Sequence, residues 1–298
     1  MKIVAIILTM NEGVHLRRCL DSLLPVVTDF LVVDSGSTDC TQEIARSFGA
    51  KVLVNPWLNY ATQFNWALAQ VVNDADWIMR IDADEYLTLD LAGEIRAKVP
   101  QLSEDVVGIY FNRRMTFGGR MIHYGGVFPI RVLRLWRYGK GHCENRWMDE
   151  HIKVVGPTVE FQGELIDDNL NSLTWWTDKH NRYSSREAVD LLNLEYGFML
   201  QDSVANLRDR SQASLKRWIK ESVYVRLPGG LRAFAYFFYR YVIHLGFLDG
   251  QVGGDFHVLQ GFWYRYLVDA KVAEVKRYMK ENNVDVATAI ANVLHIRL

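Results

Sequence analysis

The sequence predicts an α/β fold in which a mainly parallel sheet is flanked by helices and followed by a helical, aromatic-rich C-terminal extension. Over the first hundred residues, short apolar runs alternate with segments in which apolar residues recur every three or four positions. This alternation, with its short connections, indicates parallel strands joined by right-handed crossovers. After Asn171 the pattern is helical and aromatic to the end of the chain.

The individual elements follow from the same periodicity. Residues 3–8 are all apolar, which is typical of a strand buried on both faces of a sheet. We expect Asn11 to be the N-cap of the next helix, whose apolar side consists of Leu16, Leu20, Leu23 and Leu24. The remaining predicted elements are strands at 30–33, 51–54, 77–81, 107–111 and 131–136, a helix ending at Phe48 before Gly49, and a helix at 60–72.

The composition restricts the class of protein. The chain has 298 residues, 49% of them hydrophobic and 23% charged, so it can bury a sizeable core. A formal net charge of −1 gives no electrostatic case for nucleic acid. The three cysteines form no recognisable framework, and we interpret them as free thiols in a reducing cytoplasm. We find no signal peptide and no apolar run of about 18 residues, and therefore expect a protein of the cytoplasm or of the inner face of the cell membrane.

Polar residues gather directly after three of the predicted strands, at Thr9–Glu12, Asp34–Asp39 and Asp82–Glu85. Ligands of parallel α/β sheets bind beyond the carboxyl ends of the strands. The three clusters are therefore expected to form one site.

Asp82 and Asp84 suggest a metal. Carboxylates two residues apart in an extended segment point to the same side and repel, unless a cation or hydrogen-bond donors lie between them. Mg²⁺ or Mn²⁺, held by Asp84 and a nucleotide diphosphate, meets that need. A solvated acidic loop is the alternative, because Asp74-Ala75-Asp76 repeats the pattern before the strand, where a turn is expected.

Asp34 also ends a buried strand, where its carboxylate can accept a hydrogen bond from the N–H of a nucleotide base. Asp39 is expected to cap the following helix, and Ser37 to belong to the turn.

Three motifs in succession now resemble a known family. Thr9-x-Asn11-Glu12, then Val33 to Asp39, then Asp82-Ala83-Asp84-Glu85 are similar in order, spacing and strand-end placement to the nucleotide-site motifs of the family 2 glycosyltransferases, which have the GT-A fold. The resemblance implies that Thr9 and Glu12 line the nucleotide pocket, Asp34 contacts the base, Asp82 lies near the ribose and Asp84 holds Mn²⁺ or Mg²⁺. The other expected contacts with the nucleotide sugar in or beside these motifs are Asn11, Ser37, Arg80 and Ala83.

The sequence departs from this family at Gln63-Phe64-Asn65, where relatives usually carry an arginine at the position of Phe64. Gln63 and Asn65 are expected to hydrogen-bond the donor, with a satisfied helix surface as the alternative.

Displacing a nucleotide diphosphate from a sugar with inversion needs a general base that takes the proton of the acceptor hydroxyl. It also needs a metal that stabilises the negative charge of the leaving group. The acidic cluster from Trp147 to His151 resembles the base motif of the family. Asp149 and Glu150 are both eligible, and we favour Asp149. His151 either completes the metal shell or bonds a neighbouring backbone group.

Two further features concern the phosphates and the acceptor. Arg131 and Arg134 either neutralise a diphosphate or face solvent on a strand edge, and we count Arg134 among the donor contacts. The aromatic run beginning at Trp175-Trp176 suits either stacking on a sugar ring or helix packing.

From Leu215 the chain is basic and aromatic, which suits the membrane interface; a dimer seam or a lid is the alternative. The aromatic and glycine-rich stretch from Phe247 to Tyr266 resembles the tails of bacterial lipopolysaccharide-core and exopolysaccharide transferases. That resemblance implies a saccharide or lipid-linked acceptor reached from the cytosolic leaflet.

The resulting prediction is an inverting, non-processive and metal-dependent glycosyltransferase that uses a UDP-sugar or a related donor. We expect a nucleotide-sugar-binding half at 1–105, an acceptor and catalytic-base half at 106–212, and a membrane-associating or oligomerising tail at 213–298. A nicotinamide-dependent dehydrogenase is disfavoured because no G-x-G-x-x-G follows the first strand. A metal-dependent nucleotidyltransferase and a non-catalytic sugar-nucleotide-binding protein remain as alternatives.

Overall fold

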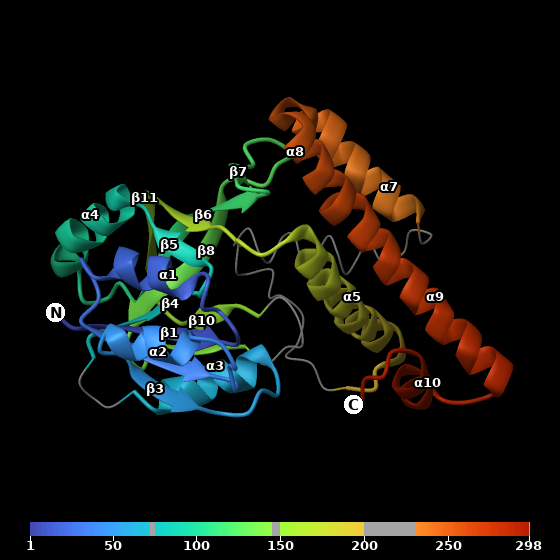
Figure 1. The fold of residues 1–298 in the computed structure, drawn as a ribbon, viewed down its shortest axis with the longest axis horizontal. Helices are drawn as coiled ribbons and strands as arrows, with labels where there is room; N and C mark the ends of the chain where they lie inside the picture. The colour runs from blue at the N-terminus through green and yellow to red at the C-terminus, as the bar shows by residue number, and fades with distance from the viewer. Residues whose placement is uncertain (72–74, 145–149, 200–229, 298) are drawn as a thin grey trace. The chain divides into compact units, whose positions relative to one another are not determined.

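The computed structural model describes residues 1–71, 75–144, 150–199 and 230–297, and divides them into two compact units (Figure 1). The first unit comprises the described residues of 1–122, 127–144 and 150–171. The second comprises 123–126 together with the described residues from Ser172 onward. Of the expected segment limits, 212/213 lies outside the described residues, and the three functional segments stay predictions.

The first unit is built on a nine-stranded sheet in which most strands run in one direction. Parallel pairing joins β3 to β2, β2 to β1 and β1 to β4, whereas β8 is antiparallel to both β4 and β6. Its strands, in spatial order, are β3 (Lys51–Val54), β2 (Asp29–Asp34), β1 (Ile3–Thr9), β4 (Trp77–Arg80), β8 (Ile130–Arg137), β6 (Gly108–Phe117), β11 (Thr158–Asp167) and β5 (Glu85–Leu87), with β7 (Arg120–Met121) paired to β6. A separate hairpin joins β9 (Gly141–Cys143) to β10 (Ile152–Val154).

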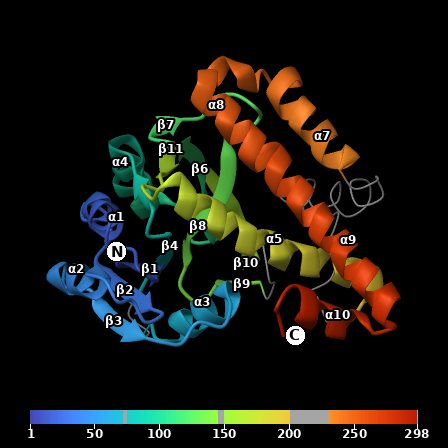
Figure 2. The same ribbon diagram turned by 45° about the vertical axis from the view of Figure 1, so that its right-hand side comes forward.

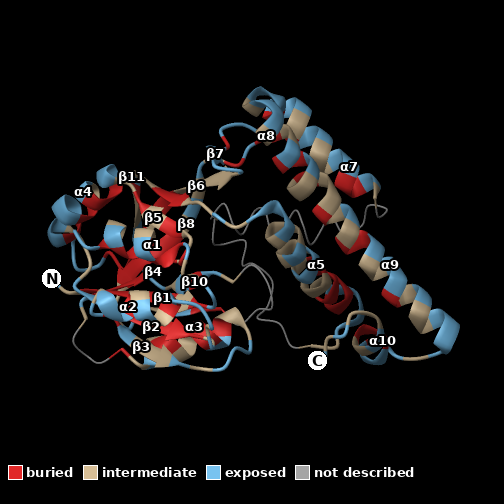
Figure 3. Ribbon diagram, viewed as in Figure 1, coloured by how far each residue is buried: buried red, intermediate tan, exposed pale blue. Residues whose placement is uncertain are grey.

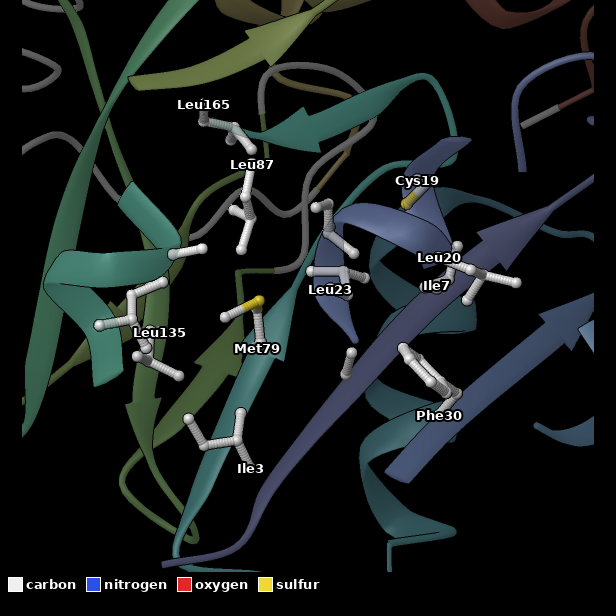
Figure 4. Packing of buried hydrophobic residues seen from close by; sticks show 14 of the residues in the cluster. Ile3, Ile7, Cys19, Leu20, Leu23, Phe30, Met79, Leu87, Leu135 and Leu165 are labelled. Atoms are coloured by element: carbon white, nitrogen blue, oxygen red, sulfur yellow. The ribbon is translucent and has the colours of Figure 1, made fainter. Parts of the chain in front are cut away.

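Helices cover both faces of this sheet. The helices of the first unit are α1 (Leu16–Leu23), α2 (Thr41–Ser47), α3 (Tyr60–Ala69), α4 (Leu89–Lys98) and the short η1 (Val99–Gln101). Ile3, Ala5 and Ile7 of β1 pack in one core with residues of α1, α2 and α4, while Val4 and Ile6 pack in a second core with residues of α3. Figure 4 shows part of the first core, and Figure 3 shows the central strands as buried. The uniformly apolar first strand is thus buried on both faces, as the sequence predicts.

The predicted N-cap of the first helix is wrong. Helix α1 begins at Leu16 with His15 at the N-cap position, and Asn11 instead has a positive φ of 56°. Asparagine tolerates this left-handed conformation, and its side-chain oxygen accepts from Thr38 N at 2.8 Å. Asn11 therefore joins two loops and leaves the helix uncapped by a side chain. Leu24, expected on the buried side, is exposed.

The parallel register brings the three polar clusters to one edge of the sheet, as predicted. Strands β2, β1 and β4 are neighbours, and Thr9, the last residue of β1, is paired with Asp34, the last residue of β2. Strand β4 ends at Arg80, immediately before Asp82.

The second unit is helical and aromatic, which confirms the predicted extension (Figure 2). Buried residues of α5, α9 and α10 form its cores. Its elements are α5 (Leu173–Tyr196), α7 (Leu231–Phe238), η3 (Tyr239–Ile243), η4 (Gly246–Asp249), α8 (Gly250–Phe256), η5 (His257–Trp263), α9 (Tyr264–Asn282) and α10 (Val286–Val293). Within the described ranges, no helix is both long enough and apolar enough to cross a membrane. All three cysteines are free, in agreement with the prediction.

The packing of β11 against α4 predicts a large effect of one methyl group. A Cβ at Gly163 would lie 2.4 Å from Leu91 Cα and 2.6 Å from Leu91 N, which are backbone atoms that cannot rotate away. We expect Gly163→Ala to lower the free energy of unfolding by about 3 kcal/mol, measured by urea denaturation. Gly93→Ala in α4 is the control, because no atom lies within 4 Å of its added Cβ. A helical alanine should be neutral or stabilise by up to about 1 kcal/mol. Equal effects of the two substitutions would contradict this packing.

Candidate functional site

Asp34 is the centre of a hydrogen-bond network at the sheet edge. Its carboxylate is fully buried at the end of β2. Oδ2 accepts from Thr9 Oγ1 at 2.8 Å and from Ser37 Oγ at 2.5 Å. Oδ1 accepts from Ser37 N at 2.8 Å, Gly36 N at 3.1 Å and Gln42 Nε2 at 2.7 Å. Burial alone would raise the pKa of Asp34, but the hydrogen bonds from Ser37, Thr9 and Gln42 outweigh it and lower the pKa. Asp34 is therefore held as a carboxylate.

A second set of hydrogen bonds ties the loop after β1 to the loop after β2. Asn11 N donates to Ser37 Oγ at 2.7 Å, and Glu12 N donates to Thr41 Oγ1 at 2.8 Å. Asp39 accepts from Gly13 N and from Thr41 N, each at 3.0 Å. Asp39 thus accepts a hydrogen bond from the backbone at the start of α2, but the prediction that it is the N-cap is wrong, because Cys40 occupies that position.

His15 connects these loops to the end of β11. Its fully buried ring accepts from Leu170 N at Nε2 (2.8 Å), and its Nδ1 lies 2.6 Å from Glu12 Oε2. Because Nε2 accepts, the proton is assigned to Nδ1, which donates to the Glu12 carboxylate. A neutral histidine thereby orients one of the predicted nucleotide contacts.

Arg134 neutralises the carboxylates that follow β4. Its side chain is buried, and Nη2 donates to Asp82 Oδ2 at 2.9 Å and to Glu85 Oε1. Tyr60 of α3 donates its hydroxyl to Asp82 Oδ1 at 2.7 Å. Burial would raise the pKa of Asp82, but Arg134, then Arg80 and the hydrogen bonds, hold it well below its usual range. Arg134 is therefore buried against Asp82 and does not face solvent on a strand edge, and its contact with a nucleotide sugar stays a prediction.

Arg80 lies at the end of β4 over aromatic rings. Its guanidinium carbon is 4.2 Å from the centroid of Tyr60 and 5.7 Å from that of Phe64, which are cation–π distances. Nε lies 3.8 Å from Asp82 Oδ1, and Nη1 donates to the carbonyl of Glu150 at 3.3 Å. Phe64, at the position where the resemblance leads one to expect arginine, thus packs beneath a different arginine.

Asp84 keeps one carboxylate oxygen for a ligand. Oδ2 accepts from Asn169 Nδ2 at 3.0 Å, and the Asp84 carbonyl accepts from Asp168 N at 3.0 Å. Oδ1 accepts no hydrogen bond from the described residues, and the side chain is partly exposed. Ala83 between the two acids is buried. An available carboxylate oxygen at this edge fits Mn²⁺ or Mg²⁺, which prefer oxygen ligands.

Gln63 and Asn65 form structural hydrogen bonds. Gln63 is buried, and its amide accepts from Asn55 Nδ2 at 2.6 Å and donates to Asn55 O and Ser35 Oγ. Asn65 pairs with both backbone groups of Cys143, donating to its carbonyl at 2.8 Å and accepting from its N–H at 2.9 Å. These contacts anchor α3 to the loop before it and to β9, which agrees with the alternative considered for both residues.

The expected base lies at the edge of what the structure describes. Asp149 is outside the described residues. Glu150 is partly buried, and His151 is exposed, with its backbone N–H donating to the buried Glu144 Oε1 at 3.0 Å. Among residues the structure describes, no three His, Cys, Asp or Glu side chains gather as a preformed metal site. The roles of Asp149, Glu150 and His151 therefore stay predictions.

Sequence analysis missed several residues of this site. Tyr60 and Glu85 contact the Asp82–Arg134 pair, and His15 and Asn169 orient Glu12 and Asp84. Glu85 belongs to the acidic motif Asp82-Ala83-Asp84-Glu85, which was the one available signal, but it was given no role of its own. The others come from distant segments, and nothing in their local sequence marks them.

In the second unit, the aromatic run of α5 packs on itself. The rings of Trp176 and His180 stack with centroids 3.5 Å apart, and Lys179 Nζ lies 4.6 Å from the Trp175 centroid. Burial is the main reason why the pKa of His180 is lowered to about 4. These contacts agree with the helix-packing interpretation of the run.

Comparison with known proteins adds independent findings. The sequence model described as glycosyl transferase family 2 matches residues 4–152. The chain is 35% identical over 201 residues to LpsC, a lipopolysaccharide core biosynthesis glycosyltransferase of Rhizobium meliloti, covering 62% of this chain and 69% of LpsC. It is 48% identical over 94 residues to an uncharacterized glycosyltransferase of Rickettsia felis, and the match spans 32% of each chain. The solved structure of S. aureus TarS 1–349 aligns over 95% of this chain and 92% of that chain, with 14% identity and a TM-score of 0.43.

The Asp34 network predicts a pH-dependent contribution to stability. We expect Asp34→Asn to lower the free energy of unfolding by about 3 kcal/mol at pH 7, since an amide cannot accept all these hydrogen bonds. The folded-state pKa is lowered, so the stabilisation is present above the unfolded-state pKa of about 3.9 and is lost as pH falls through the folded-state value. Urea denaturation between pH 7 and about pH 3 should therefore show the two proteins converging. Asp21→Asn, at an exposed position of α1, is the control. A difference that stays constant with pH would rule out this role.

Proposed function

Because the chain belongs to glycosyl transferase family 2, we propose that it transfers a sugar from a nucleotide-diphosphate donor, with inversion and without processivity, to a saccharide or lipid-linked acceptor. The observation that carries the proposal is the convergence of the ends of β2, β1 and β4, which brings the three nucleotide-site motifs to one edge of the sheet. A UDP-sugar is the proposed donor.

The donor side is assigned to residues that the sheet edge already holds in place. Thr9, Asn11 and Glu12 line the nucleotide pocket, and Asp34 contacts the base. The Asp34 carboxylate already accepts hydrogen bonds from protein groups. The N–H of a nucleotide base would therefore contact Asp34 by replacing one of these protein donors. The partly exposed Gln42 amide, 2.7 Å from Oδ1, is the side chain we assign to that exchange.

The diphosphate side is assigned to the residues after β4. Asp82 and Arg134 lie near the ribose and the phosphates, with Arg80 behind them. The available Oδ1 of Asp84 supports its assignment as a ligand of Mn²⁺ or Mg²⁺, and His151 is assigned to the same shell. A cation bound there would neutralise the charge of the leaving diphosphate.

The acceptor side is assigned to the chain around Glu150. Asp149 is the proposed general base, with Glu150 as the second candidate, and either takes the proton of the acceptor hydroxyl. The hydrogen bond from Arg80 to the Glu150 carbonyl supports this placement, since it joins that segment to the end of β4.

The proposed setting is cell-surface polysaccharide synthesis at the cytosolic face of the membrane. The identity to LpsC supports a lipopolysaccharide or related glycan as the acceptor. We propose peripheral membrane contact through the C-terminal unit; association between copies of the chain is the alternative use of the same segment.

Donor binding is the first test. A panel of sugar nucleotides differing in base and sugar should contain at least one that binds and is slowly hydrolysed in the presence of Mn²⁺ or Mg²⁺, and chelator should stop the hydrolysis. Asp84→Ala should lower metal-dependent turnover at least about 100-fold. Asp76→Ala is a matched control, because Asp76 belongs to the acidic pair that precedes β4, and its carboxylate contacts the start of the chain. No binding to any sugar nucleotide would sink the transferase proposal.

The base assignment is tested by separating transfer from donor binding. Asp149→Asn should abolish transfer to an acceptor and leave the donor dissociation constant unchanged, since a base acts on the acceptor hydroxyl. Glu150→Gln is the comparison, and transfer and binding are measured on both. If only Glu150→Gln abolishes transfer, the role belongs to Glu150.

A further inference from the structure

The surface of α7 and the turns after it is apolar to an unusual degree. Within residues 230–248 the sequence contains no Asp, Glu or Lys. Large apolar side chains on this stretch are 45–60% exposed, and we call the following residues the apolar ridge: Leu231, Phe234, Phe238, Ile243, Leu245 and Leu248. Leu231, Phe234 and Phe238 recur at intervals of three and four, which places them on one face of α7.

The charged side chains of the same stretch point inward. Arg232 is 6% exposed and pairs with the buried Asp269 of α9, with Nε 2.7 Å from Oδ1. Arg240 is 5% exposed, donates Nε to the Gly125 carbonyl at 3.1 Å, and lies over the Tyr236 and Phe256 rings. Helix α7 lies beside α9 in both views (Figures 1 and 2).

An ordinary surface helix turns its apolar stripe to the core and its charges to water. Here the arginines are buried together with Ala233, and large apolar side chains lie on the outer face as well. Burying an arginine costs desolvation energy. Each large apolar side chain left in water forgoes about 1.5–3 kcal/mol of burial energy. Neither the burial of the arginines nor the exposure of the large apolar side chains favours the folded state in water. The apolar ridge therefore points to a non-aqueous partner.

Leu245 supports the same conclusion independently. It has a positive φ of 59°, a conformation that costs a residue with a Cβ about 1–2 kcal/mol and that glycine or asparagine adopts more easily. The Leu245 side chain is 45% exposed, so the described chain covers only part of it. An exposed leucine at such a turn is useful only if something else covers it.

Charge decides between the possible occupants. Arg232 and Arg240 are buried, but the preceding residues 215–229 contain four basic residues and one acidic residue, whereas the whole chain has a net charge of −1. A basic segment leading into an apolar surface is complementary to an anionic lipid surface. Two copies meeting through this segment would bring like charges together.

We propose that residues 231–248 form an interfacial membrane-binding surface, in which the apolar ridge enters the headgroup and upper acyl region of an anionic bilayer. This refines the proposed peripheral location and rests on it only for biological context, since binding to lipid needs neither donor nor acceptor. Tyr239, Tyr241 and His244 lie within the same stretch and suit the headgroup level, because their polar tips can stay hydrated.

The test is co-sedimentation of the full chain with vesicles of phosphatidylethanolamine and phosphatidylglycerol, compared with vesicles of pure phosphatidylcholine. We expect binding to the anionic vesicles, weaker binding to the neutral ones, and a loss of at least about 10-fold in affinity for the double variant Phe234→Gln, Phe238→Gln. The matched control is Leu89→Gln, Val155→Gln, which removes two exposed apolar side chains of the first unit and should bind like the unaltered chain.

Two results would overturn the proposal. One is equal sedimentation of the ridge variant and the unaltered chain. The other is a dimer of the unaltered chain, seen by analytical ultracentrifugation without lipid, that the ridge variant dissociates while neither protein binds vesicles. Circular dichroism checks that the variants are folded. Donor binding without vesicles should be the same in both proteins, so a failed transferase proposal and a failed membrane proposal give different results.

Discussion

The rest of the candidate site depends on one buried cation, the guanidinium of Arg134 between Asp82 and Glu85. Removing one member of such a buried group leaves an uncompensated charge, which costs several kcal/mol. The expected repulsion between Asp82 and Asp84 is relieved by protein groups: Arg134 and Tyr60 hold Asp82, and Asn169 holds Asp84. A metal is therefore not needed to keep this loop in shape. The charge of the neighbouring Asp82 is already neutralised by protein groups, and Oδ1 of Asp84 accepts no hydrogen bond from the described residues.

The nucleotide side of the edge is fixed by the same means. The Asp34 carboxylate accepts hydrogen bonds from the loop that follows it. The neutral His15 links Glu12 to the backbone at Leu170. The polar groups at this edge are thus oriented before any ligand arrives, which reduces the entropy lost on binding. Under the proposed function, a nucleotide-sugar donor would bind this edge by exchanging hydrogen bonds rather than by ordering loops, and Gln42 is the side chain we assign to that exchange.

Prediction from sequence succeeded where periodicity or chain order carried the information. The strands were predictable because apolar runs bounded by polar turns have few alternative structures, and the meeting of Thr9, Asp34 and Asp82 followed from parallel pairing. It failed where side chains choose between equivalent partners. Asn11 bonds a neighbouring loop rather than capping a helix, and the N-cap position expected for Asp39 is occupied by Cys40. Such choices depend on distances between segments far apart in the chain, which local sequence does not encode.

The arginines show where strand periodicity is not enough. Arg131 and Arg134 are three residues apart on β8, but the register between β8 and β6 shifts between Leu133 and Leu135, so alternation alone does not fix their faces. One pairs with Glu160 at the surface, at 2.9 Å, and the other is buried against two carboxylates. Arg232 and Arg240 are likewise buried, although they interrupt an aromatic helix in a way that suggests solvent-facing charges. The two settings differ in what surrounds the arginine. Arg134 lies against Asp82 and Glu85 between core residues of β8, whereas Arg232 pairs with Asp269 beneath an α7 surface that is apolar and exposed. This difference separates a requirement of folding from a surface that we propose to be covered by lipid.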